Sequence, residues 1–261
     1  MTKVKSNLYK YFLKFLKYKL ILVLLTGFFL AIAVEAPQIH QGYLLSKARK
    51  QVFKLVYPNN HSSGGTGFTV QAPSGRLLTL TNEHICAGAK GDVVHGEYEN
   101  NPGVYESLKI IERSKETDLC VLEPMPKTEP LHMSESLAVG DQVALIGHPL
   151  LQDLTLTLGQ VNSFLMIEIA IDRNIDDVAC ANRGGKLQDA GIEEALFGTT
   201  TICVRDIFSA RTTLQSFPGN SGSPVVNIWG RVVGVLFAGD GRTNWGCIVP
   251  ASAINRFLSI Y

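Results

Sequence analysis

The 261-residue sequence contains few charged residues and no strong excess of either charge. Only 18% of the residues are charged and 46% are hydrophobic, a balance that excludes an intrinsically disordered chain and allows a sizeable core. Residues 1–19 hold six of the 24 basic residues and no acid, which leaves 18 basic against 23 acidic residues, net −5, in the remainder. The body therefore has no basic face for nucleic acid.

The sequence also lacks the residue spacing of a metal site. Its five cysteines and six histidines are scattered along the chain, with none of the close Cys and His pairs that hold zinc. We therefore expect neither a metal nor another cofactor.

No charge interrupts residues 20–34, but this run of fifteen residues is shorter than the ~20 of a usual membrane span. The lysine-rich lead and the small residues after the run are typical of an export signal. Flanking lysines and Tyr18 could extend the run by snorkelling, so we favour an uncleaved anchor, with the lysines cytoplasmic and the body across the membrane. Cleavage and secretion, or a basic helix lying on the membrane, are the alternatives.

A turn at residues 217–224 (FPGNSGSP) is suited to holding one serine hydroxyl in a fixed, exposed place. Serine is a weak nucleophile, so it needs a base for its proton and donors for the oxyanion that forms. Pro218 fixes one φ and Gly219 has no Cβ, so the N–H groups of Gly219 and Ser221 can point to one spot. An ordinary glycine-rich hairpin would show the same pattern.

Among the histidines, only His84 is expected on a rigid mount, at the end of an apolar strand over residues 76–81. Asp118 opens a short apolar run at residues 119–122, where a carboxylate can orient an imidazole and stabilise the imidazolium. Each residue also has a plain structural interpretation, His84 as a surface histidine and Asp118 as a turn residue.

The order His84, Asp118, Ser221 resembles that of the trypsin-like (chymotrypsin-fold) serine endopeptidases, especially the bacterial and viral HtrA-type branch. The resemblance spans roughly residues 52–257. It is carried by residues 64–70 (GGTGFTV), 80–84 (LTNEH), 117–122 (TDLCVL), 219–224 (GNSGSP) and 246–252 (GCIVPAS).

This resemblance implies an all-β fold of two antiparallel six-stranded β-barrels, with the active site between them and a C-terminal helix. His84 and Asp118 would come from the first barrel and Ser221 from the second. The expected boundaries are a basic lead and signal or anchor helix at 1–36, a connector at 37–50 and a protease domain at 51–261, with barrels at about 51–123 and 137–250 and a helix at 251–260.

Three departures from the family pattern stand out. Residues 166–200 look inserted between two strands of the second barrel, with a weak helix around 187–196; they suit a surface decoration, a lid, an exosite or an inhibitory plug. Asn220 precedes the nucleophile and cannot form the ion pair with a newly cut N-terminus that an aspartate forms in digestive relatives. The sequence ends eleven residues after Pro250, so we expect no PDZ-type peptide-binding module after the protease.

The cysteines are expected to be mostly structural. Cys86, Cys120 and Cys247 occupy apolar positions where the resembled family tolerates alanine or valine, which predicts buried thiols rather than bridges. Cys180 and Cys203 could pair in an oxidising compartment.

By family position, five uncharged residues should line the pocket for the substrate side chain before the scissile bond: Gln215, Ser216, Ala238, Gly239 and Gly246. We therefore predict a preference for uncharged residues over arginine or lysine.

We interpret the chain as a serine endopeptidase with His84 as base, Asp118 as orienter, Ser221 as nucleophile and the Gly219 and Ser221 amides as oxyanion donors. Its partners would be protein or peptide substrates and, through the N-terminal helix, a membrane. The alternative is a catalytically silent, membrane-tethered relative that only binds peptides. A protease that matures a polyprotein would share the chemistry and differ only in substrate.

Overall fold

The computed structural model describes residues 17–19, 23, 26, 41–182, 184–191, 198–240 and 243–261. The chain divides into two units, residues 1–44 and 45–261. In the first unit, the described residues are helical. No helix among the described residues is long and apolar enough to cross a membrane, and most of the expected export segment at residues 20–34 lies outside them.

Six strands in the first half of the second unit form a closed antiparallel barrel in the order β1-β2-β3-β6-β5-β4. The strands are β1 (Val52–Tyr57), β2 (Asn60–Gln71), β3 (Leu77–Thr81), β4 (Val93–Glu97), β5 (Tyr105–Ser114) and β6 (Leu119–Leu122). Apolar side chains on their inward faces, such as Phe53, Leu55 and Leu108, fill the interior. A closed six-stranded barrel agrees with the fold that the sequence predicted.

The second half forms a seven-stranded antiparallel sheet in the order β13-β12-β11-β7-β8-β10-β9, in which β10 also pairs with β13. The strands are β7 (Gln142–Gly147), β8 (Thr155–Arg173), β9 (Lys186–Asp189), β10 (Thr201–Thr212), β11 (Pro224–Asn227), β12 (Val232–Asp240) and β13 (Trp245–Pro250). The prediction of six strands here was therefore one strand short.

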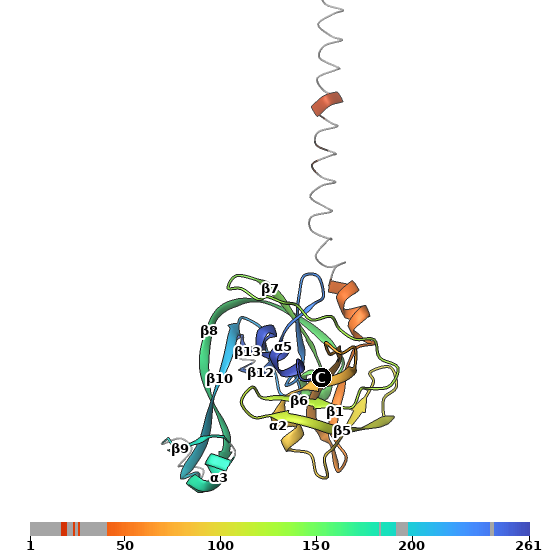
Figure 1. Ribbon diagram of the computed structural model, residues 1–261. Helices are drawn as coiled ribbons and strands as arrows, with labels where there is room; N and C mark the ends of the chain where they lie inside the picture. Colours follow the sequence, from red (N-terminus) through yellow and green to blue (C-terminus); the bar gives the residue numbers. More distant parts are fainter. Residues whose placement is uncertain are drawn as a thin grey trace, which may run out of the picture. The chain divides into compact units, whose positions relative to one another are not determined.

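The additional strand comes from the segment expected as an insert. β8 and β10 continue through it in antiparallel register as far as Arg173 opposite Ile202, and β9 pairs along β10. Residues along β8 alternate between exposed and half-buried positions, the period of a strand. We call the described part of residues 166–208 the ribbon; Figure 1 shows β9 at the far end of β8 and β10.

The prediction of a weak helix around residues 187–196 was wrong for the part of this range that the structure describes. Residues 187–189 belong to strand β9, and the helix of this segment is α3 (Asp177–Asn182), while residues 192–197 lie outside the described part. Pairing with β10 decides the conformation here, because a tertiary partner overrides a weak helical propensity.

The predicted C-terminal helix is present as α5 (Ala251–Leu258), which starts directly after Pro250. Its buried residues Ala251, Ile254 and Leu258 recur at helical spacing, so one face packs inward.

Two disulfides cross-link the second unit. The prediction that Cys86 and Cys120 are separate buried thiols was wrong, because they form a disulfide. The helix α2 (Glu83–Ala87) packs beside β6 and brings residues 34 positions apart within reach, a proximity that the sequence does not reveal. Cys180 and Cys203 also pair. Cys247 is a buried free cysteine, as predicted, and burial raises the pKa of its thiol to about 11.

Candidate active site

His84 lies on the short helix α2, which begins two residues after β3. The sequence predicted the end of a strand, and the chain instead turns into a helix at Glu83. The imidazole stays accessible, with 42% of its side chain exposed, while Ile85 and Cys86 on the same helix are buried. The buried side of α2 thus provides the rigid mount, and the open side presents His84.

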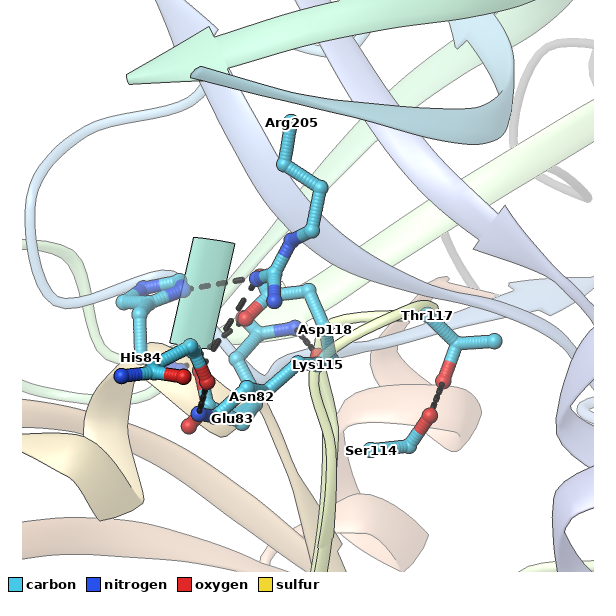
Figure 2. A network of polar contacts seen from close by, with 9 residues as sticks. Asn82, Glu83, His84, Ser114, Lys115, Thr117, Asp118 and Arg205 are labelled. Carbon is cyan, nitrogen blue, oxygen red and sulfur yellow. Dashed lines mark hydrogen bonds and ion pairs between the residues drawn. The ribbon is translucent and has the colours of Figure 1, made fainter. Parts of the chain in front are cut away.

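Asp118 is fully buried and holds His84 at two points. Asp118 Oδ2 lies 2.8 Å from His84 Nδ1, and Oδ1 accepts a 2.9 Å hydrogen bond from the backbone N–H of His84. The backbone carbonyl of Asp118 accepts hydrogen bonds from Asn82 Nδ2 and from the N–H of Glu83. Figure 2 shows the contacts of Asp118 with the side chains of His84 and Asn82. Asp118 has a φ of 52°, a left-handed conformation that aspartate tolerates better than most residues.

The electrostatics of His84 follow from this contact. Burial lowers the pKa of His84, but the hydrogen bond and the charge of Asp118 raise it, and the net pKa lies above the ordinary value of 6.5. Because only Asp118 accepts at Nδ1, that nitrogen carries the proton in the neutral ring. Nε2 is then free to accept a proton.

The turn with Ser221 is attached to β2 of the first barrel. The N–H of Thr66 donates a 2.8 Å hydrogen bond to the carbonyl of Ser221, and Thr66 Oγ1 donates one of 2.8 Å to the carbonyl of Gly219. Gly222 has a φ of 85°, and a Cβ there would lie 2.2 Å from Thr66 O. Only glycine therefore fits this place in the turn.

The amide nitrogens of Gly219 and Ser221 donate no hydrogen bond within the described part of the chain. Gly219 has a φ of 91°, so its peptide orientation also depends on glycine. The preceding carbonyl, that of Pro218, is held by the N–H of Leu150 in the loop after β7. Two N–H groups close in the chain are thus left available for a ligand.

Among the described residues, no hydrogen bond joins Ser221 to His84. Gly65 on β2 lies close to Ser221 and to the helix that carries His84. A Cβ on Gly65 would lie 2.6 Å from Ser221 O and 2.8 Å from the side chain of Ile85, the residue after His84. The structure therefore shows a direct contact between His84 and Asp118. Ser221 is near helix α2 only across Gly65 of β2.

A cavity of about 730 Å³ opens beside His84 and Asp118. Its first-barrel wall is polar, and its opposite wall is largely apolar and comes from the ribbon and β12. The lining includes Glu83, His84, Arg113, Lys115 and Asp118 on one side and Ile169, Ala170, Ile171, Arg205, Phe237 and Ala238 on the other. The ribbon is therefore part of the site and not a remote decoration.

The predicted pocket residues are brought together in part. Gly239 and Gly246 face each other across β12 and β13, and a Cβ on Gly239 would lie 2.6 Å from the Cβ of Ser216. Ala238 lines the cavity beside His84 instead. Gln215 is half-buried in the segment that leads to the turn.

Arg205 is the site residue that the sequence analysis missed. It lies on β10 with its side chain 5% exposed, and its Nη2 is 3.9 Å from Glu83 Oε2. The available signal was its place on the inward phase of a strand, between the buried Cys203 and Ile207. A charged residue in such a place is rarely buried without a partner.

Solved structures share this fold. The Rv3671c protease from M. tuberculosis, in its active form, is 17% identical, with a TM-score of 0.58 and coverage of 83% of this chain and 82% of that one. The serine endoprotease from Yersinia pestis is also 17% identical, with a TM-score of 0.58 and coverage of 84% and 66%.

Proteins with similar sequences also include serine proteases. The Bacillus subtilis (strain 168) serine protease Do-like HtrA is 28% identical over 181 residues, which are 68% of this chain and 34% of the relative. Serine protease Do-like HtrB of the same strain is 27% identical over 200 residues, 74% and 37% of the two chains. The chain thus spans little more than a third of the length of these relatives. Residues 65–235, more than half of the 261, match the trypsin-like peptidase domain, and the chain therefore belongs to this family.

Proposed function

We propose that this chain is a serine endopeptidase that hydrolyses peptide bonds through an acyl-enzyme intermediate. The observation that carries the proposal is the 2.8 Å contact of His84 with Asp118 in a trypsin-like peptidase domain. In this mechanism Ser221 Oγ attacks the carbonyl carbon while His84 Nε2 takes the hydroxyl proton. His84 then returns the proton to the leaving amine, and a water activated by His84 releases the acyl group.

Asp118 orients His84 in this mechanism. It keeps the proton on Nδ1, so that Nε2 faces the reaction, and it stabilises the imidazolium that forms. Because the pKa of His84 is raised, the fraction of neutral base increases with pH through a midpoint above 6.5. The reaction rate should follow the same curve.

The amides of Gly219 and Ser221 are the proposed oxyanion donors. Their N–H groups have no acceptor among the described residues, as donors reserved for a transition state require. The side chain of Asn220 is buried and neutral, so we expect no requirement for a newly cut N-terminus. Activity that appears only after N-terminal processing would contradict this part of the proposal.

Protein or peptide substrates are proposed, with uncharged residues preferred before the scissile bond. The close packing of Gly239 against Ser216 and the absence of charge among the five pocket residues support this preference. Cleavage of a peptide library predominantly after arginine or lysine would contradict it.

The N-terminal segment is proposed to place the protease domain outside the cytoplasm, either as an anchor or after cleavage. The lysine-rich lead and the uncharged residues 20–34 support this proposal. Protease accessibility of a C-terminal tag in intact cells, together with the mass of the mature N-terminus, would distinguish an anchored, a secreted and a cytoplasmic chain.

Fluorophosphonate labelling of the full chain tests the catalytic proposal. We expect the parent to react, Ser221→Ala to be inert and Asp118→Asn to react about 10⁴-fold more slowly. Ser62→Ala, which changes an exposed serine on β2, should react like the parent.

The alternative, a catalytically silent peptide-binding relative, is favoured only by the missing hydrogen bond between Ser221 and His84. It would be supported if the folded parent stayed unlabelled yet bound peptides. Labelling that persists in Ser221→Ala would refute the assigned nucleophile.

A further inference from the structure

A buried arginine from the second sheet lies beside the catalytic pair of the first barrel. The Arg205 side chain is 5% exposed and lies 3.9 Å from the Glu83 carboxylate, which is itself 10% exposed. Figure 2 shows the end of the Arg205 side chain lying toward Asp118 and Glu83, with the His84 ring close by. One cation thus faces two carboxylates that come from the other half of the fold.

Hydrogen bonds do not explain why the Arg205 side chain is buried. Within the described part of the chain, its Nε and Nη1 are buried without a hydrogen-bond partner. Such burial is unfavourable for a charged group unless opposite charges compensate it. Burial lowers the pKa of Arg205, and the charges of Asp118 and Glu83 counteract this shift. The two carboxylates are therefore what stabilises the buried guanidinium.

These two unpartnered nitrogens also argue against a ligand site. Both atoms are inaccessible, so a substrate carboxylate in the cavity would not reach them without a rearrangement. The charge of Arg205 acts at short range on the residues already packed around it.

The ribbon that carries Arg205 is fixed to the first barrel close to Asp118. Lys115 Nζ, three residues before Asp118, donates a 3.1 Å hydrogen bond to the carbonyl of Asn182 on α3. The disulfide of Cys180 with Cys203 ties α3 to β10, two residues before Arg205. One hydrogen bond and one disulfide thus connect the segment before Asp118 with the segment before Arg205.

We propose that Arg205 is a positioning residue for the catalytic pair, because its buried guanidinium faces Asp118 and Glu83 and offsets the negative charge that they place beside His84. This inference rests on the proposed function for its effect on rate. Asp118 and Glu83 favour the imidazolium form of His84, and Arg205 opposes them. The ribbon therefore tunes the basicity of a histidine that belongs to the other barrel.

The test is the titration of the His84 ring in the full chain, followed by NMR, with the pH dependence of fluorophosphonate labelling beside it. In Arg205→Met, we expect the His84 midpoint to rise, because the cation that opposes the imidazolium form is removed. Labelling near pH 6 should fall several-fold, while labelling well above the midpoint changes little. Arg205→Lys keeps the charge and should restore most of the shift.

Lys186→Met is the matched control, because Lys186 is an exposed ribbon cation paired with Asp206. It should leave the His84 midpoint unchanged. If Arg205→Met does not fold, the single variant Glu83→Gln is compared with the double variant that carries Glu83→Gln and Arg205→Met. The His84 midpoint should lie at a higher pH in the double variant.

An unchanged His84 midpoint in folded Arg205→Met would overturn the inference and leave Arg205 a structural residue. A midpoint shift without any labelling of the parent would instead overturn the proposed enzyme and keep the positioning role. The two failures are therefore distinguishable.

Discussion

Two histidines of the second unit, His84 and His148, have opposite environments. His84 contacts a buried carboxylate, and its pKa is raised. His148 is completely buried; its Nδ1 lies 2.9 Å from the carbonyl of Gln152, so Nδ1 carries the proton and Nε2 is unprotonated. That Nε2 is buried without a partner in the described part of the chain. Burial therefore lowers the pKa of His148 to about 4.

This lowered pKa predicts a loss of stability in acid. Below the ordinary pKa of 6.5 the unfolded chain binds a proton at His148, whereas the folded chain does not until about pH 4. The free energy of unfolding should therefore fall as the pH decreases from 6.5 to 4, by about 3 kcal/mol from this group. Urea unfolding at pH 7 and pH 4.5 measures the loss.

The control is His148→Gln, in which this titration is absent. Its stability should depend less on pH over the same range, whereas the exposed His61→Gln should behave like the parent. A pH dependence in His148→Gln equal to that of the parent would contradict the assignment.

At the scale of elements, the ribbon depends on one disulfide. β9 pairs only with β10 among the described strands, and α3 has a single buried residue, Cys180. Little apolar burial therefore holds the far end of the ribbon. The Cys180–Cys203 disulfide closes a loop of 23 residues and supplies the missing constraint.

We expect Cys203→Ser to destabilise the end of the ribbon by about 3 kcal/mol. Amide hydrogen exchange in α3 and β9 should become roughly a hundredfold faster, while the strands of the first barrel keep their protection. Cys247→Ser, at the free buried cysteine, should leave exchange in the ribbon unchanged. Equal exchange in α3 and β9 of Cys203→Ser and the parent would show that the disulfide does not hold the ribbon.

At the scale of the whole second unit, Thr66 connects the barrel to the sheet. It lies on β2, is fully buried, donates to the carbonyl of Gly219 and accepts from the N–H of His148 at 3.2 Å. One hydroxyl thus satisfies two backbone groups of the opposite half, one in the Ser221 turn and one after β7.

Thr66→Val keeps the shape and removes the hydroxyl, which leaves both backbone groups without this partner. We expect a loss of about 1–3 kcal/mol in the free energy of unfolding and a clear fall in fluorophosphonate labelling, because the turn loses its fixed orientation.

Thr69→Val is the matched control on the same strand. Thr69 is also fully buried, but its hydroxyl bonds to Thr128, away from the turn. This variant should lose stability and keep its labelling. Equal labelling of the two folded variants would show that Thr66 does not support the turn.

Local patterns in the sequence were sufficient for much of the fold. Short β-prone runs separated by glycine, proline and asparagine predicted the first barrel, and the resemblance to the trypsin-like family predicted a C-terminal helix, which is α5. His84, Asp118 and Ser221 were proposed because each follows or opens a recognisable run, and the structure brings the first two together at 2.8 Å.

Only the tertiary structure decided the features that need two distant segments to meet. The disulfide of Cys86 with Cys120 requires α2 to pack on β6, and the course of the ribbon requires β10 to pair with β8, β9 and β13 at once. Arg205 on β10 reaches Glu83 on α2 for the same reason. The sequence alone indicated most of the strands and turns and the candidate site residues, because these depend on near neighbours. Pairing and the burial of charge depend on contacts across the fold, which local sequence does not encode.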